Sequence, residues 1–133
     1  MKKSDVKKWV KALRSNKYRQ AKGSLCVEDE INGESYYCCL GVACDLLSDD
    51  DWIKQPWSEE WSIGNYEAFD FPEIFDKEKW GATETTSFPS LSHLEEMGLD
   101  AAYAQDLAKL NDSGMDFVDI ANKIEKDLLN DGP

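Results

Sequence analysis

The sequence predicts an α+β fold in one small domain. Three observations favour this class: a length of 133 residues, apolar residues at helical spacing near both ends, and an Asn-Gly pair between two strand-like segments. With 41% hydrophobic residues, the chain can form a core without disulfides or metal. We therefore expect a single domain over residues 1–133, with an N-terminal helix, a β-hairpin with further short strands, and three to four more helices.

The first helix is predicted to begin at Ser4, whose hydroxyl can cap it. Its apolar stripe recurs at i, i+3, i+4 and i+7 and comprises Val6, Trp9, Val10 and Leu13. A hairpin is predicted next, with Asn32 and Gly33 as the central residues of a type I′ turn. That turn would place Cys26 opposite Cys39.

A short helix over residues 40–47 follows the hairpin, with Cys44 in the core. Residues 48–88 lose clear periodicity and form an acidic, aromatic-rich insertion, with nine aromatic residues among 11 acids and three lysines. Because so many aromatics argue against disorder, we expect short strands or turns that fold back over the core.

The C-terminal part is predicted to be helical. Pro89 or Ser90 opens a short helix that ends at Gly98, and Asp100 caps a second helix. The second stripe contains Tyr103, Leu107 and Leu110. Ser113 is expected to cap a last helix, in a variant of the capping box. The last stripe contains Phe117, Ile120, Ala121, Ile124 and Leu128. The tail, 130–133, is expected to fray.

Charge is distributed unevenly along the chain. Residues 1–23 carry nine of the 15 basic groups and one acid, whereas the whole chain has a net charge of −12. Most of the surface would repel phosphate, so we expect no general nucleic-acid binding. No apolar run approaches the ~20 residues of a membrane span, and no signal peptide is recognisable. We therefore expect a cytoplasmic protein without a membrane partner.

The residues give little sign of catalysis or of a metal. The four cysteines, at 26, 38, 39 and 44, lack a C-x-x-C spacing, and His93 is distant from them, so we expect them to serve as small apolar residues. The neighbours of His93 are typical of an amphipathic surface helix. No nucleophile elbow, Walker A or G-x-G-x-x-G motif is present. We assign no catalytic residue, metal or cofactor and expect a non-enzymatic protein.

The loop after the first helix is the candidate binding site. It combines cations, an amide and an aromatic ring beside a glycine, a set that could hold a phosphate and stack a base. The candidate ligand-binding residues are Lys17, Tyr18, Arg19, Gln20, Lys22 and Tyr37, with Tyr18 or Tyr37 as the stacking surface. In the alternative interpretation, Tyr18 packs on the hairpin and the cations pair with acidic groups. Tyr36 and Tyr37 point to opposite faces, so at most one joins the loop.

Three segments together resemble a family of small, uncharacterised bacteriophage and prophage proteins. They are W-V-K-A-L-R-S-N-K-Y-R-Q-A-K-G-S-L (9–25), Y-C-C-L-G-V-A-C-D-L (37–46) and L-N-D-S-G-M-D-F-V-D-I-A-N-K-I-E (110–125). Relatives tend to have glycine where this chain has Asn16 and Ala21. The resemblance implies phage infection of a bacterium and brings no established activity or site residues.

Together, these observations predict a phage accessory protein that acts in the bacterial host cytoplasm. It would bind a small anionic or nucleotide-like ligand, and removal of a host signalling nucleotide would give it an anti-defence role. As an alternative, its acidic surface would act as a protein–protein inhibitor or DNA mimic and occupy a basic site on a host protein. A hydrolase with an acidic pocket is a third hypothesis. A monomer and a homodimer are both compatible with the sequence.

Overall fold

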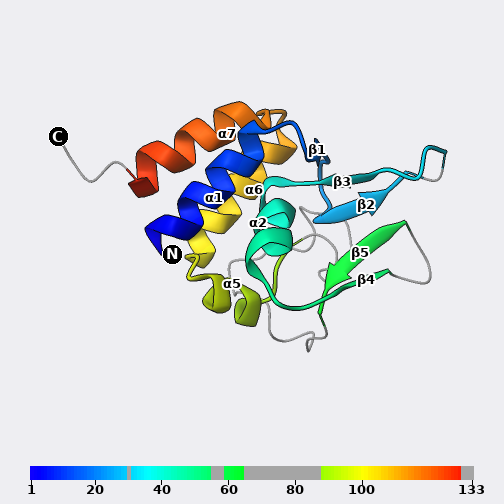
Figure 1. The fold of residues 1–133 in the computed structure, drawn as a ribbon, viewed down its shortest axis with the longest axis horizontal. Helices are drawn as coiled ribbons and strands as arrows, with labels where there is room; N and C mark the ends of the chain where they lie inside the picture. The colour runs from blue at the N-terminus through cyan, green and yellow to red at the C-terminus, as the bar shows by residue number, and fades with distance from the viewer. Residues whose placement is uncertain (30, 55–58, 65–87, 130–133) are drawn as a thin grey trace.

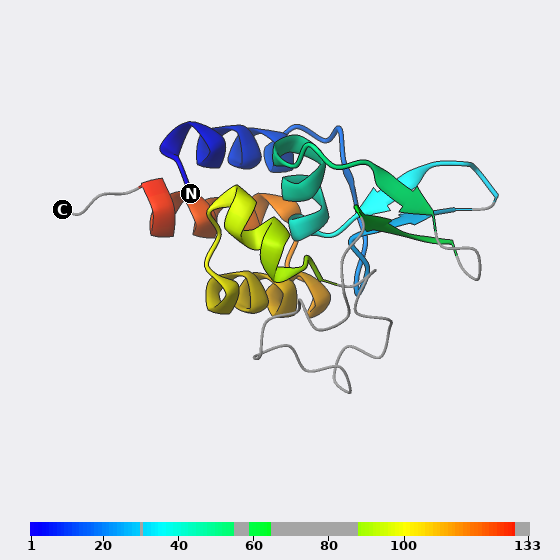
Figure 2. The ribbon, with the colours of Figure 1, turned by 90° about the horizontal axis from the view of Figure 1, so that it is seen from below.

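The computed structural model describes residues 1–29, 31–54, 59–64 and 88–129. Within them the chain forms a mixed α+β fold, in which five α-helices lie beside a five-stranded sheet. Figures 1 and 2 show the helices grouped at one end and the sheet at the other, with α2 between the two. Most of the insertion predicted at 48–88, and the tail at 130–133, lie outside the described residues.

The helices are α1 (Lys3–Arg14), α2 (Cys39–Leu47), α5 (Leu91–Met97), α6 (Ala101–Asp112) and α7 (Phe117–Ile124), and α7 continues as the π-helix η2 (Glu125–Leu129). Helix α1 packs against α2, α7 and η2, and α2 packs against α6. The stripes predicted for α1 and for the first two turns of α7 are buried, as expected. In α6 the buried face is rotated from the predicted one. Tyr103 and Leu110 are only half-buried, and the fully buried positions include Ala104 and Asn111.

The sheet has the strand order β1-β3-β2-β5-β4. Its strands are β1 (Arg19–Gln20), β2 (Cys26–Glu28), β3 (Ser35–Tyr37), β4 (Trp52–Lys54) and β5 (Glu60–Ile63). Only β1 and β3 run parallel; the other neighbours are antiparallel. The predicted hairpin is thus present, and two strands from the acidic insertion extend its sheet, as the aromatic content of that segment predicted.

The register of the hairpin differs from the predicted one by two residues. Cys26 lies opposite Tyr37 and not opposite Cys39. The cause is the loop, where the Asp29 carboxylate accepts from the Ile31 amide at 2.8 Å, and the Asp29 carbonyl accepts from the Gly33 amide. These bonds close a longer turn. Of its described residues only Gly33 has a positive φ, and a type I′ turn would also require one at Asn32, so the type I′ turn is wrong.

Helix boundaries follow the predicted caps in the middle of the chain and depart from them at both ends. Ser90 and Asp100 cap α5 and α6, and Gly98 ends α5 in the left-handed conformation. Helix α1 instead begins before Ser4 without a side-chain cap. Helix α7 is capped by Asp116, whose carboxylate accepts from the Asp119 amide. Ser113 is occupied at the end of α6, where its hydroxyl donates to the Leu110 carbonyl.

The turn after α1 depends on a left-handed residue. Asn16 has φ = 63°, the only positive φ of a non-glycine residue in the described part of the chain. Asparagine tolerates this conformation better than most residues, while glycine adopts it without strain. Asn16 therefore occupies a position where the backbone itself favours glycine.

Candidate functional site

The loop after α1 is fixed to the rest of the fold by one buried side chain, Asn111 of α6. Its amide donates to the Ala21 carbonyl at 2.7 Å, and its oxygen accepts from the Gln20 side chain at 2.9 Å and the Cys39 amide at 3.2 Å. The next residue, Asp112, accepts from the Gly23 amide at 2.7 Å. The loop, the start of α2 and the end of α6 thus meet at one polar cluster.

The residues predicted to form one ligand site divide between the two faces of β1. The Gln20 amide donates to Asn111 and to the Met115 carbonyl, so its donors stabilise the loop. Arg19, on the opposite face, forms an ion pair with Glu34 of the hairpin at 3.0 Å. Lys22 lines a hollow of about 310 Å³ with Tyr36, away from Tyr18.

Tyr18 and Tyr37, by contrast, lie together, and Trp52 joins them. Their rings meet edge to face, with centroids 5.1 Å apart for Tyr18–Tyr37 and 5.9 Å for Tyr37–Trp52. The Asp45 carboxylate accepts from the Tyr18 hydroxyl at 2.6 Å and from the Trp52 indole at 3.0 Å. Burial, followed by the bond to Asp45, raises the pKa of the Tyr18 phenol. Tyr18 is therefore a fixed, neutral, half-buried ring.

The exposed face of α1 is uniformly basic. At about 100° per residue, its solvent-facing arc carries only cations and serine. The cations on that arc are Lys3, Lys7, Lys8, Lys11 and Arg14. Four neighbouring lysines form no ion pair within the described residues: Lys7, Lys8, Lys11 and, just beyond the helix, Lys17. Lys8 and Lys11 were not among the residues predicted for the site, although helical spacing already groups them on one face of α1.

A hollow of about 330 Å³ opens between α1 and α2, next to Tyr18. We call it the Tyr18 hollow. Its cations are Lys8, Lys11 and Lys17, and its walls include the Tyr18 ring and the partly exposed Leu46. Of the predicted site residues, the structure thus brings Lys17 and Tyr18 together in this hollow. Tyr37 does not line the hollow and packs against the Tyr18 ring. An aromatic and apolar wall beside three ammonium groups is suited to an anion that also carries a ring.

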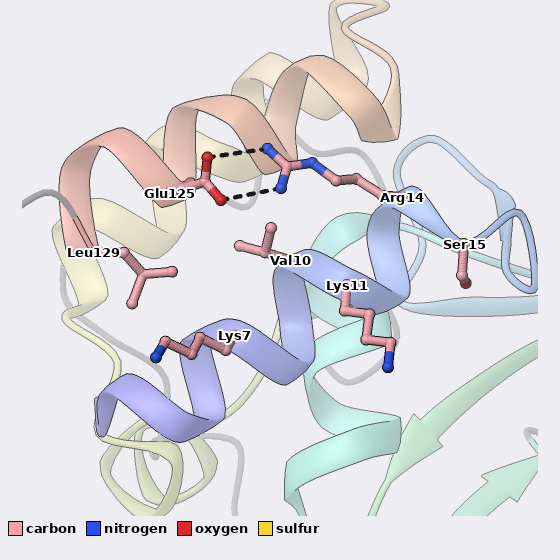
Figure 3. A pocket seen from close by; sticks show the side chains of 7 residues that line it. All are labelled: Lys7, Val10, Lys11, Arg14, Ser15, Glu125 and Leu129. Carbon is pink, nitrogen blue, oxygen red and sulfur yellow. Dashed lines mark hydrogen bonds and ion pairs between the residues drawn. The ribbon is translucent and has the colours of Figure 1, made fainter.

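A second hollow, of about 440 Å³, lies on the other side of α1, between α1 and η2. We call it the Lys7 hollow. Figure 3 shows Val10 and Leu129 between the two helices, and Arg14 reaching across to Glu125. The Arg14–Glu125 ion pair, at 3.0 Å, lowers the pKa of Glu125, and Arg14 also donates to Asn122. The charge of Arg14 is therefore largely offset, and Lys7 and Lys11 supply the net positive charge of this hollow.

A comparison with known protein families gives a match to this chain. The sequence profile of a family described as a domain of unknown function, DUF8296, fits residues 1–128. The chain belongs to the DUF8296 family. No curated protein and no solved structure matches it. The DUF8296 match extends from before α1 into η2 and so includes the basic face of α1 and nearly all residues of both hollows.

In this DUF8296 chain His93 has a structural role. Its imidazole is buried, with Nδ1 2.7 Å from the Ser90 hydroxyl and Nε2 2.6 Å from the Asp50 carboxylate. Because a carboxylate only accepts hydrogen bonds, Nε2 donates to Asp50. Ser90 is fully buried and caps α5, so its hydroxyl cannot meet a substrate. Helix α5 is amphipathic, as its sequence indicated, and His93 lies on its buried face, where it joins α5 to the chain after α2.

The four cysteines of the chain are all buried and free, which confirms their predicted role in the core. Burial raises the pKa of the Cys26 thiol to about 11 and that of Cys38 to about 12. The Cys38 sulfur also caps α2 by accepting from the Gly41 amide at 3.4 Å. Within the described residues, no group of three or more His, Cys, Asp or Glu side chains could hold a metal ion. No helix in the described ranges is long and apolar enough to span a membrane.

Proposed function

We propose that this protein binds a small anionic, nucleotide-like ligand in the Tyr18 hollow and does not transform it chemically. The observation that carries the proposal is the clustering of Lys8, Lys11 and Lys17 around an aromatic ring, without carboxylate partners in the described structure. Like charges on one face repel one another, and a bound anion relieves that repulsion. Tyr18, held by Asp45, offers a ring for a base to stack on.

The proposed site contains Lys8 and Lys11 in addition to three of the residues predicted from the sequence, Lys17, Tyr18 and the supporting Tyr37. Arg19 and Gln20 already have partners, Glu34 and Asn111, which a ligand would have to displace. Resemblance to phage proteins supports a setting in the cytoplasm of an infected bacterium. Capture of a host signalling nucleotide there would counter host defence without any need for turnover.

A thermal-shift titration with adenosine monophosphate tests the proposal, with inorganic phosphate as the control probe that lacks a base. Nucleotide at 100 times its Kd should stabilise the fold by about 2.7 kcal/mol, which raises Tm by several degrees. Lys8→Gln and Lys17→Gln should each weaken binding, whereas Lys22→Gln should leave it unchanged. If only Lys22→Gln loses binding, the ligand occupies the hollow beside Tyr36 and not the Tyr18 hollow. An absence of any nucleotide effect on the wild-type protein would refute the proposal.

The tip of the hairpin favours a second candidate function, binding to a host protein. Ile31 is 96% exposed, and its loop is held by the Asp29 and Gly33 bonds. Asp29 lies beside it, while Glu34 is paired with Arg19. The tip therefore presents an apolar side chain next to an acid, a complement to an apolar pocket with a basic rim. In this version of the acidic protein–protein inhibitor hypothesis, the hairpin tip is the surface that binds the host protein. Capture of a host protein that survives Ile31→Asp would refute it, because that variant places a charge at the proposed anchor.

A further inference from the structure

The two hollows on α1 are adjacent parts of one surface. Both are lined by Lys11 and Ser15, the Tyr18 hollow on the α2 side and the Lys7 hollow on the η2 side. Helical geometry places Lys11 about 40° around the axis from Lys7, with Lys8 about 60° further. Lys11 therefore lies on the crest that separates the hollows, within reach of both.

The hollows share their charge and differ in their walls. The Tyr18 hollow offers an aromatic ring, whereas the Lys7 hollow has an apolar floor of Val10 and Leu129. Each can cover the flat face of a base, and each has a lysine of its own at the rim, Lys8 on one side and Lys7 on the other. A single mononucleotide would fill one hollow and leave the cation of the other without a counter-charge.

Resting on the proposed function, we infer that the ligand is a dinucleotide. One nucleotide occupies the Tyr18 hollow, the other occupies the Lys7 hollow, and the linking phosphate lies over Lys11. Two linked nucleotides bring two anionic groups to a row of three lysines and cover both apolar surfaces. A long nucleic-acid strand fits less well, because beyond the basic face it would meet the acidic surface of a chain with a net charge of −12.

Calorimetric titration of the full-length protein with three probes tests the inference. The probes are adenosine monophosphate, the 5′-phosphorylated dinucleotide pApA and the corresponding octanucleotide. We expect pApA to bind about tenfold more tightly than the mononucleotide, as one additional charge-assisted contact implies. The octanucleotide should bind more tightly than pApA only by the statistical factor that its additional binding registers provide. The slope of log K against log[salt] should become steeper by about 0.7 from the mononucleotide to pApA.

Variants separate the two hollows. Lys7→Gln should remove most of the gain of pApA over the mononucleotide and leave mononucleotide binding unchanged, whereas Lys8→Gln should weaken both. Lys109→Gln, at an exposed lysine of α6, is the matched control and should change neither. All three changes are on the surface, so each variant should fold.

Failure of the inference can be distinguished from failure of the proposed function. Equal affinity for the mononucleotide and pApA, both lost in Lys8→Gln, would overturn the dinucleotide and leave the one-hollow site intact. An affinity that continues to rise steeply to the octanucleotide would replace the dinucleotide with a strand-binding surface. Absence of binding by all three probes would overturn both.

Discussion

Replacing Asn111 with alanine tests whether one buried amide holds the loop, α2 and α6 together. The change removes the partner of the Cys39 amide and of the Ala21 carbonyl, both in buried residues, while the Gln20 amide keeps its bond to Met115. Each unsatisfied buried backbone group costs about 1–3 kcal/mol, so we expect a loss of about 2–6 kcal/mol. That is a large part of the 5–15 kcal/mol typical of a whole domain.

Urea denaturation followed by tryptophan fluorescence measures this loss as a shift in the transition midpoint at a constant m value. Asn122→Ala is the matched control, because Asn122 makes the same kind of side-chain bond, 2.6 Å from Arg14, on the surface. It should cost no more than about 0.5 kcal/mol. If Asn111→Ala costs less than about 1 kcal/mol, or no more than Asn122→Ala, the cluster does not hold these elements together.

Three further predictions concern the backbone and the thiols. Gly41→Ala should cost about 2 kcal/mol or more in urea denaturation, since the added Cβ would overlap the Leu25 carbonyl oxygen; an unchanged midpoint would contradict this contact. Asn16→Ala should destabilise by about 1 kcal/mol and Asn16→Gly should not, because of the positive φ; equal effects would contradict the turn. The buried thiols should resist Ellman's reagent at pH 8. Folding raises the pKa of the Cys26 thiol from 9.0 to about 11, so this thiol loses its proton at lower pH in the unfolded chain than in the folded one. The free energy of unfolding should therefore fall between pH 9 and pH 11, and it should fall less in Cys26→Ala.

Much of the candidate site follows from local sequence patterns. Helical spacing alone places Lys7, Lys8 and Lys11 on the face of α1 opposite its buried stripe. The order of residues after α1 likewise places Lys17 and Tyr18 immediately beyond that face. What spacing could not supply was the wall of each hollow, because Leu46 and Leu129 come from distant segments. For this reason Lys17, Arg19 and Lys22, close together in the loop, were predicted as one site and lie apart in the fold.

The aromatic support of Tyr18 is a second contribution of tertiary structure. Asp45 lies on α2 and Trp52 on β4, and nothing in the local pattern of either segment indicates that both contact the Tyr18 region. The meeting of these side chains requires the sheet to bring β3 beside the loop and the chain after α2 to return along β4. Tyr18 is held in one orientation only because these elements converge.

The sequence by itself determined the fold class, the apolar stripes of α1 and α7, the caps of α5 and α6, and the burial of the cysteines. These features depend on contacts a few residues apart, or on an apolar residue's preference for any core. The tertiary structure decided the hairpin register, the cap of α7 and the role of His93. Each depended on competition for a hydrogen bond: Asp29 closed a longer turn, Ser113 was taken by the end of α6, and Asp50 reached His93 from 43 residues away. Such competition depends on which groups the whole fold brings within bonding distance, and local spacing does not specify it.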